Sequence, residues 1–544
     1  MGVSASWYAK SAAFLGVVAS LHASVAVAQG ESVALPAAAS PTASVVETPA
    51  PQAEMTAPTA ERLDPPDGSA ELEKTKPSQS SWIWQHSLAE RAATISVSAV
   101  PIGTPAPTDA QFVPASAQGE QRTRLGTQLQ FKQERGFVRE LVAAIEGELT
   151  TPELSKGIGN LWLRKGYLEA TTMGGRLTAG RMTSTWGLGI LAQAGDDDAL
   201  QFGFRRAGNL VNRLQYAVLP AGLVQKTTDL SQIFPLVAVV AYDQVVRDDL
   251  VLYPGDAATN AVGALLYRGK DLQFGLYSVM RDQVDKAGLT LQANIVDGFF
   301  NYHSDFEVGT LGIAAEGVMV KGTTTWLRTP SQPESLNVMQ YGGVARLELK
   351  NTWLQARLET GLASGDSAPF DNTIRNFKFT SDYRIGLVLF PQVMRIQAEQ
   401  TRRNLSDPRL VGQGPAGAER ILTDGAVSQA LYVAPVIRAT PHPRWAFLAG
   451  GVIAHAPVDV AEPYQTYMAG GIATGSRGSR NKRDLGVEFD GAVEFNYPLF
   501  DEFSAIARVD GGIWLPGAAF DDAAGVGAAA VGAIQGQLSV RGVF

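Results

Sequence analysis

Apolar and polar residues alternate one by one along much of the chain, from about residue 91 to the C-terminus. In residues 339–350, for example, Leu347 belongs to the apolar set of positions, whereas Arg346 and Glu348 belong to the polar set. Successive side chains of a β-strand point to opposite faces, so this pattern predicts strands with one apolar and one charged face. The same alternation recurs in residues 272–281, 354–362, 485–496 and 534–544.

The length of these runs distinguishes between the folds that alternation allows. A sandwich, a β-helix, a propeller and a membrane barrel all contain alternating strands, but the sequence lacks the fixed-period repeat that a β-helix or a propeller needs. The runs last about 10 to 13 residues, whereas strands of soluble proteins have about 5 to 6 residues. A tilted strand needs about 9 to 11 residues to cross a bilayer. We therefore predict an all-β fold, a transmembrane antiparallel β-barrel.

Short and long breaks alternate between the runs, which number about twenty, beginning near residues 92–100. Short turns on one rim and long loops on the other are typical of outer-membrane barrels. The short breaks lie near residues 133–138, 173–174, 269, 351, 391–393, 441–442 and 497–501. The long breaks lie near residues 101–121, 150–161, 185–210, 247–258, 319–337, 363–381, 403–427, 457–483 and 513–533. Two breaks depart from the alternation, a longer one at 221–233 and a brief one at 282–286.

The N-terminal region contains two segments that precede the predicted barrel (residues 86–544). Lys10, an apolar run at 12–19 and the small-x-small sequence at 26–28 predict a signal peptide, residues 1–28. The alternative, a membrane anchor, is disfavoured because polar residues interrupt the apolar run. Residues 29–85 are rich in Ala, Pro, Ser and Thr and are acidic, so we expect a disordered linker that serves as a spacer or a tether.

The composition excludes several classes of protein. The chain has no cysteine, so an exported form has no disulfide framework. No segment after the N-terminal region reaches the roughly 18 continuous apolar residues that a spanning helix needs. The formal net charge is −8, which argues against a general nucleic-acid-binding protein. The 56 glycines and the low charged fraction of 18% suit a long β-rich chain.

The last strand ends in an aromatic residue, Phe544, at the final position of the chain. This end resembles the terminal signature by which the barrel-assembly machinery recognises outer-membrane proteins. We therefore predict that Phe544 is an assembly signal and that the barrel-assembly machinery is a partner.

Five segments resemble the alginate-export-type family of outer-membrane barrels, and in particular the related exported barrel proteins of myxobacterial type. They are residues 180–191 (GRMTSTWGLGIL), 212–216, 359–366, 386–390 and 485–490. The resemblance implies about 18 strands, so we expect 18, with 16 to 20 allowed. It also implies a second candidate function, because export members of this family carry polysaccharide through an arginine-rich lumen.

Charged residues on the polar faces of the runs are the candidate pore-lining residues. In a barrel they line an aqueous pore and select solutes by charge and size, or they form a charge-paired ladder that stiffens the wall. Because both signs are present, we expect weak ion selectivity. The candidates are Arg346, Glu348, Arg357, Glu359, Glu488, Asp490, Glu494, Arg508, Asp510 and Arg541.

Three loop motifs suggest other chemistry. Arg477, Arg480, Lys482 and Arg483 form a basic cluster that suits lipopolysaccharide phosphates or is a solvated loop. Residues 196–198 are three consecutive aspartates without the ligand spacing of a calcium loop, so we expect a solvated acidic loop and no metal. Residues 365–367 (Gly-Asp-Ser) resemble the nucleophile block of one lipase family, but their position is that of an ordinary turn. The histidines that would complete such a site lie far apart, so we predict no enzyme.

These patterns, together with the family resemblance, lead to three candidate functions. The first is a porin-like channel of the outer membrane for the passive transport of small hydrophilic solutes. The second is a polysaccharide-export pore, and the third is a plugged barrel with a structural or adhesive role. The expected partners are outer-membrane lipid, lipopolysaccharide, and small solutes or polysaccharide; no cofactor is expected.

Overall fold

The computed structural model describes residues 81–102, 115–133, 136–151, 160–204, 208–220, 235–327, 335–407, 417–500 and 502–544. The predicted signal peptide and most of the predicted linker lie outside these residues. The described residues belong to one compact unit, Pro65–Phe544. Its first strand begins at Ser81, so residues 81–85, which we predicted to be linker, are part of the barrel wall.

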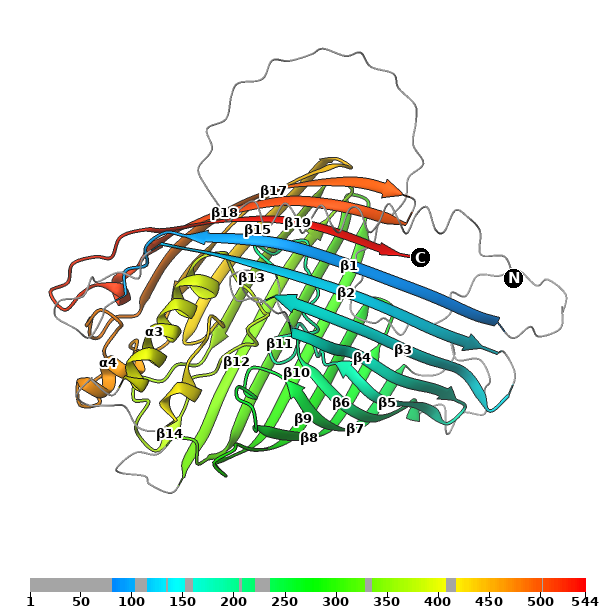
Figure 1. The fold of residues 1–544 in the computed structure, drawn as a ribbon, viewed down its shortest axis with the longest axis horizontal. Coiled ribbons are helices and arrows are strands. Elements are labelled where there is room, and N and C mark those ends of the chain that lie inside the picture. Colours follow the sequence, from blue (N-terminus) through cyan, green and yellow to red (C-terminus); the bar gives the residue numbers. More distant parts are fainter. Residues whose placement is uncertain are drawn as a thin grey trace, which may run out of the picture. The chain divides into compact units, whose positions relative to one another are not determined.

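Within the described ranges, nineteen strands are hydrogen-bonded into one sheet, and eighteen of them form a closed antiparallel barrel, whose wall is drawn in Figure 1. β1 pairs with both β2 and β19, which closes the wall. The nineteenth strand, β14 (Thr373–Ile374), has two residues and pairs in parallel with β12. The wall strands are β1 (Ser81–Val97), β2 (Ser116–Lys132), β3 (Val138–Thr151), β4 (Asn160–Thr172), β5 (Gly175–Thr183), β6 (Leu210–Val218), β7 (Leu236–Arg247), β8 (Ala257–Arg268), β9 (Leu272–Val284), β10 (Thr290–Phe306), β11 (Gly309–Thr324), β12 (Leu336–Lys350), β13 (Leu354–Ala363), β15 (Ala430–His442), β16 (Trp445–His455), β17 (Asp484–Phe500), β18 (Phe503–Pro516) and β19 (Val531–Val543).

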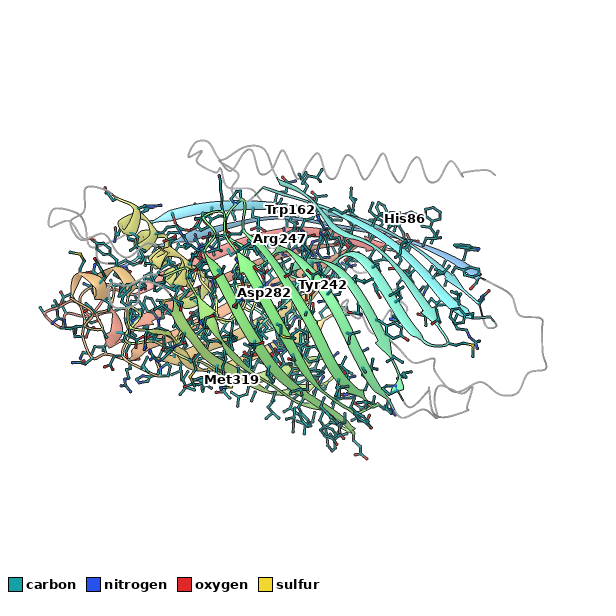
Figure 2. The ribbon with its side chains drawn as sticks, turned by 90° about the horizontal axis from the view of Figure 1, so that it is seen from below. His86, Trp162, Tyr242, Arg247, Asp282 and Met319 are labelled. Atoms are coloured by element: carbon teal, nitrogen blue, oxygen red, sulfur yellow. The ribbon has the colours of Figure 1, made fainter. Side chains whose placement is uncertain are left out.

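The wall has apolar side chains on its outer face and polar side chains on its inner face, which is the inverse of the distribution in a soluble protein. On β17, Phe489 points outward and is 56% exposed, whereas its neighbours Glu488 and Asp490 point into the barrel and are 0% and 7% exposed. Tyr242 and Met319, labelled in Figure 2, are further exposed outward residues. An apolar outer surface around a polar interior is what a transmembrane barrel requires. The predicted assignment of the two faces is therefore confirmed for residues 488–493 of β17, whereas Leu485, which we predicted on the apolar outer face, is 1% exposed and belongs to the interior apolar cluster.

The two ends of the barrel differ in their connections and in their aromatic residues. At one end, which we call the turn end, the connections are mostly short and β1 begins where β19 finishes. Aromatic rings pair there, with ring centroids 4.7 Å apart for Trp82 and Phe131 and 5.4 Å apart for Phe503 and Phe544. Aromatic side chains of this kind are enriched at membrane–water interfaces. The opposite end, which we call the loop end, carries the long connections, as the sequence predicted.

One connection at the loop end replaces two strands that we predicted on either side of residues 391–393. Residues 364–429 form a single long segment, which contains a π-helix (η3, Leu389–Met394), α3 (Arg395–Ser406) and a 3-10 turn (η4, Ala418–Ile421). Leu387, Val388 and Leu389 are at most 1% exposed, so this apolar run is buried inside the barrel and does not face lipid. The remaining helical elements are α4 (Pro463–Met468) and a 3-10 turn (η5, Ala518–Phe520). None of the helices in the described ranges is long and apolar enough to cross a membrane.

Candidate functional site: a constriction inside the barrel

Two connections fold into the barrel and meet there. We call residues 184–209, between β5 and β6, inner loop 1, and residues 364–429, between β13 and β15, inner loop 2. The backbone N–H of Thr380 donates to the carbonyl of Ile190 (2.8 Å), and the N–H of Gly208 donates to Asp382 Oδ2 (2.6 Å). The two inner loops therefore form one connected constriction.

Carboxylates of β10 and β11 fix the base of inner loop 1. The indole Nε1 of Trp186 donates to Asp297 Oδ1 at 2.8 Å. Glu316 accepts the backbone N–H groups of Leu188 and Gly189, the second at 3.0 Å. Gly189 has a positive φ of 91°, a conformation that glycine adopts without steric cost. The backbone of residues 186–189 (WGLG) therefore lies against the buried carboxylate of Glu316.

Inner loop 1 then crosses to the wall formed by β1, β2 and β4, where its aspartates meet arginines. Asp196 Oδ1 lies 3.1 Å from Arg124 and 3.0 Å from Arg164. Asp197 lies 3.1 Å from Arg91 and 3.6 Å from Arg122. Residues 196–198 therefore do not form an acidic loop that contacts solvent alone, as we expected, because their carboxylates are also paired with wall arginines. They dock onto arginines from distant parts of the sequence, which no local pattern reveals.

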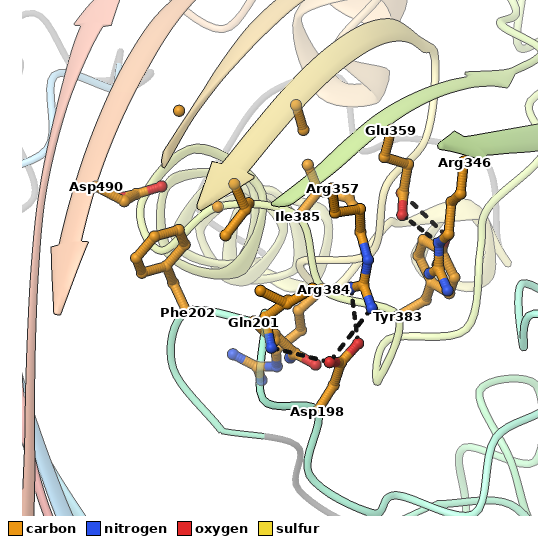
Figure 3. A pocket seen from close by; sticks show the side chains of 15 residues that line it. Asp198, Gln201, Phe202, Arg346, Arg357, Glu359, Tyr383, Arg384, Ile385 and Asp490 are labelled. Carbon is orange, nitrogen blue, oxygen red and sulfur yellow. Dashed lines mark hydrogen bonds and ion pairs between the residues drawn. The ribbon is translucent and has the colours of Figure 1, made fainter. Parts of the chain in front are cut away.

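Two further contacts hold the end of inner loop 1. Asp198 pairs with Arg357 of β13 at 2.8 Å (Figure 3). The Arg508 guanidinium of β18 donates to the carbonyl of Gln201 at 2.5 Å. The loop thus contacts wall strands on several sides of the barrel, and it divides the interior.

Inner loop 2 is anchored by residues that we predicted to line an open pore. Glu488 accepts the backbone N–H groups of Leu387, Val388 and Leu389 at 2.5, 2.6 and 2.7 Å. Arg346 donates to the Tyr383 hydroxyl at 2.6 Å, and that hydroxyl donates to Glu359 at 3.0 Å. These wall residues act as anchors, because each makes its hydrogen bonds to the loop or to a neighbouring wall residue.

A third connection, between β7 and β8, supports inner loop 2 from the side. Asp249 accepts from the Ser381 backbone N–H and hydroxyl, both at 2.7 Å. Burial raises the pKa of the Asp249 carboxyl, and Lys378 and Ser381 partly oppose the shift. Arg420 of inner loop 2 pairs with Asp256 at 3.1 Å. The constriction is therefore attached to the wall at many polar points.

Apolar side chains fill part of the interior between these anchors. Phe377, Phe379 and Phe390 of inner loop 2 are buried at 3%, 0% and 1% exposure. They belong to one cluster with wall residues such as Val338 and Trp514. The lumen near the loop end is thus packed like a small protein core on the side that inner loop 2 occupies.

Cavities remain beside the loops. One, of about 30 Å³, lies around Asp198, Arg357 and Asp490 (Figure 3). Another, of about 190 Å³, lies between both inner loops and the wall. Its lining combines apolar residues with cationic and polar ones, among them Leu250, Phe379, Lys378, Arg420, Asn260 and Trp326.

The predicted pore-lining residues all lie on wall strands, but they do not form one surface. Glu494 pairs with Arg438 at 2.9 Å, and Arg508 pairs with Asp510 at 2.7 Å, so these contacts belong to the wall itself. Arg541 lies near the turn end and is exposed. The predicted pore-lining residues do not include the charged residues of the first four strands. Residues 120–124 alternate in the same way as the predicted strands, so this pattern could have indicated them. The charged residues of the first four strands are Arg91, Glu120, Arg122, Arg124, Glu146, Glu148 and Arg164.

The other candidate motifs have local structural contacts. Arg477 donates to the carbonyl of Phe520 at 2.9 Å, and Arg483 pairs with Asp459 at 2.7 Å. Arg480 and Lys482 are exposed at the loop end. Asp366 accepts the backbone N–H groups of Ala368 and Arg375 at 3.0 and 2.9 Å, so residues 365–367 belong to a hydrogen-bonded turn.

The chain is similar to solved structures of proteins from Acinetobacter baumannii and Pseudomonas aeruginosa. OccAB1 of Acinetobacter baumannii has a TM-score of 0.48 and 10% identity, covering 85% of this chain and 96% of that chain. OccK8 (OprE) of Pseudomonas aeruginosa has a TM-score of 0.47 and 10% identity, covering 85% and 98%. OccK2 (OpdF) of the same organism, solved in complex with glucuronate, has a TM-score of 0.46 and 10% identity, covering 85% and 96%. No protein-family model matches the sequence, the alginate-export type included, and no curated protein matches it.

Proposed function

We propose that this protein is an outer-membrane channel through which small hydrophilic solutes pass by diffusion. The observation that carries the proposal is the closed, inverted barrel whose charged interior is narrowed by two inward-folded loops. An apolar outer surface places the barrel in a bilayer, and a polar interior stabilises water and solutes within it. The proposed function needs no chemical reaction and no cofactor.

The constriction explains why the proposed solutes are small. Inner loop 1 and inner loop 2 are bonded to each other and to the wall, so they narrow the space inside the barrel. Part of the space that remains is the cavity of about 190 Å³, which apolar, cationic and polar residues line. Rings of charged side chains select solutes by their field and by their size. Of the predicted pore-lining residues, Glu348 and Arg541 are among those with solvent-exposed side chains, so we propose that they contact passing solutes.

The test is single-channel recording of the full-length protein in planar lipid bilayers. We expect discrete conductance steps in KCl, and a larger conductance when the tip of inner loop 2 is shortened. A parallel liposome-swelling assay should show uptake of small sugars and amino acids and exclusion of oligosaccharides. Absence of conductance from both the intact and the shortened protein would contradict the proposal.

Two other functions have support from particular observations. A plugged structural barrel is favoured by the buried aromatic residues of inner loop 2. A polysaccharide-export pore, as in the alginate-export-type family, is favoured by the arginines of β1, β2 and β4. Conductance in the bilayer assay would exclude the plugged structural barrel. Uptake of oligo-uronates in the swelling assay would support the polysaccharide-export pore, whereas their exclusion would support a channel for small solutes.

We further propose the orientation and partners of the barrel. The loop end faces the cell exterior, where exposed Arg480 and Lys482 are placed to contact lipopolysaccharide phosphates. The turn end faces the periplasm, where Phe544 is the assembly signal for the barrel-assembly machinery. Binding of lipopolysaccharide to the wild type and to an Arg480→Gln/Lys482→Gln variant, compared by native gel shift, tests the first of these assignments.

A further inference from the structure

Four arginines stand in a row across the first four strands of the wall. Arg91 of β1, Arg122 and Arg124 of β2, and Arg164 of β4 point into the barrel and are buried. We call them the arginine row. Wall carboxylates contact the row, with Glu120 at 2.9 Å from Arg91 and Glu148 at 2.6 Å from Arg124, and Glu146 on Arg164. Among the residues that the structure describes, the row therefore brings four guanidinium groups together with three wall carboxylates.

Inner loop 1 covers the arginine row with its own negative groups. Asp196 pairs with Arg124 and Arg164, and Asp197 pairs with Arg91 and Arg122. The carbonyl oxygen of Ala194 adds a hydrogen bond from Arg164 at 2.7 Å. The loop therefore occupies the place over the arginine row that an anionic solute would otherwise take.

The exposure of the side chains shows which charge a solute meets. The arginine side chains of the row are 3% to 9% exposed, whereas those of Asp196 and Asp197 are 45% and 50% exposed. Solvent in the lumen therefore reaches the carboxylates and hardly reaches the guanidinium groups. Although burial raises the pKa of Asp196, the Arg164 and Arg124 guanidinium groups hold it below its ordinary value, so this carboxylate is ionised at neutral pH.

The position of the two aspartates is set by backbone geometry on either side of them. Gly195 and Gly208 have positive φ values of 75° and 77°. A Cβ atom at Gly208 would lie 2.1 Å from the carbonyl oxygen of Ala194. The chain returns past its own backbone at this point, which only glycine permits. The tip of the loop is thereby held over the arginine row.

We propose that Asp196 and Asp197 are selectivity-determining residues, which act as a built-in anion that masks the arginine row and prevents the channel from selecting anions. This inference rests on the proposed channel function. Two fixed negative charges in a narrow lumen oppose the entry of anions, and their removal leaves the excess positive charge of the arginine row uncompensated. The same arginines would make an anion-selective wall if the loop lacked these two carboxylates.

The experiment measures reversal potentials of the full-length protein in a KCl gradient. In the Asp196→Asn/Asp197→Asn variant, the chloride-to-potassium permeability ratio should rise by about threefold or more over the wild type. Asp196→Glu/Asp197→Glu keeps the charge and should keep the wild-type ratio. Every variant retains Arg205 and Arg206, which belong to the same loop but lie outside the described residues, so the comparison isolates the two carboxylates.

A matched control removes two neighbouring aspartates elsewhere at the loop end. Asp521→Asn/Asp522→Asn changes the net charge by the same amount in the connection between β18 and β19 and should leave the ratio unchanged. An equal shift in this control, or an unchanged ratio in a conducting Asp196→Asn/Asp197→Asn variant, would overturn the inference. If the double variant does not fold, as judged by heat-modifiable gel mobility, the single Asp197→Asn variant takes its place and should give a smaller shift in the same direction. Failure of every variant and of the wild type to conduct would instead contradict the proposed channel function.

Discussion

At the scale of single residues, position on the wall decides what a side chain contributes. Leu347 and Glu348 are neighbours on β12, yet Leu347 is exposed on the outer face and Glu348 bonds to Arg357 inside the barrel at 2.6 Å. Among the charged residues of the interior, some anchor a loop and others pair with the wall. Glu488 and Glu494 share one strand and one face, but the first holds inner loop 2 and the second pairs with Arg438.

Substitution of adjacent residues on β12 tests the assignment of the two faces. Leu347→Arg should lower the free energy of unfolding by about 2 to 4 kcal/mol, because it puts a charge into the lipid-facing surface. Glu348→Arg should cost less, because the new side chain remains in the water-lined interior. Urea titration of the protein in lipid vesicles measures both. Equal losses would mean that the register is shifted by one residue, since one step exchanges the faces.

Removal of the Glu488 carboxylate should release inner loop 2. Glu488→Ala leaves three backbone N–H groups without their acceptor, which should cost on the order of 2 to 3 kcal/mol and should increase single-channel conductance and current noise. Glu494→Ala, on the same face of β17, is the matched control and should alter conductance little. An unchanged conductance in Glu488→Ala would show that this anchor does not control the opening.

At the scale of elements, the inner loops are held by ion pairs at the wall and by an apolar cluster in the interior. Inner loop 1 depends mainly on the ion pairs, through Asp196, Asp197 and Asp198. Inner loop 2 depends on both, with Phe379 and Phe390 in the cluster. The two loops should therefore respond differently to conditions that neutralise carboxylates.

Acid should loosen inner loop 1 before the barrel itself unfolds. Burial raises the pKa of Asp196, but the Arg164 guanidinium lowers this pKa by more, so the pKa of Asp196 lies below its ordinary value. A carboxyl whose pKa is lowered in the folded state contributes stability above the ordinary value of about 3.9 and loses it as the pH falls through the folded value. Channel noise should therefore increase as the pH falls below about 4. Noise that stays unchanged below about pH 4 would contradict this assignment.

At the scale of the whole molecule, closure of the barrel by β1 and β19 satisfies the backbone groups that an open edge would leave unpaired in lipid. The closing seam extends to the last residue, because the N–H of Phe544 donates to the carbonyl of His86 at 2.9 Å and the N–H of His86 donates to the carbonyl of Phe544 at 2.7 Å. The Phe544 ring also lies 5.5 Å from the ring of His86. The end of the chain therefore takes part in the wall.

Deletion of Phe544 should reduce the amount of folded barrel in the outer membrane. The deletion removes two seam hydrogen bonds together with the predicted assembly signal, and heat-modifiable gel mobility of membrane fractions measures the folded amount. Refolding of purified protein into vesicles separates the two effects. A loss in cells with normal refolding in vesicles indicates the signal, and a loss in both indicates the seam. Normal folding in both would contradict the prediction.

The wall of the barrel could be predicted from the amino-acid sequence alone. Alternation with period two fixes which residues of a long strand face lipid and which face the interior, as on β9, where Leu276 and Met280 are exposed and Arg281 is buried. The short turns and the long loops followed from the breaks in the same pattern. The expected eighteen strands, by contrast, came from a family resemblance, because the alternation alone suggested about twenty. The faces of the strands and the lengths of the connections are local features, so they can be deduced from neighbouring residues.

The contents of the barrel could not be predicted in this way, because they depend on contacts between residues far apart in the sequence. The run at residues 386–390 is apolar enough to resemble a strand, but its backbone N–H groups find their acceptor in Glu488, about a hundred residues away in the sequence. The aspartates at 196–198 likewise find their partners on β1, β2, β4 and β13. Whether an acidic or apolar segment is solvated or docked depends on which side chains the closed barrel brings opposite it. Closure is a property of all eighteen strands together, and no local pattern contains it.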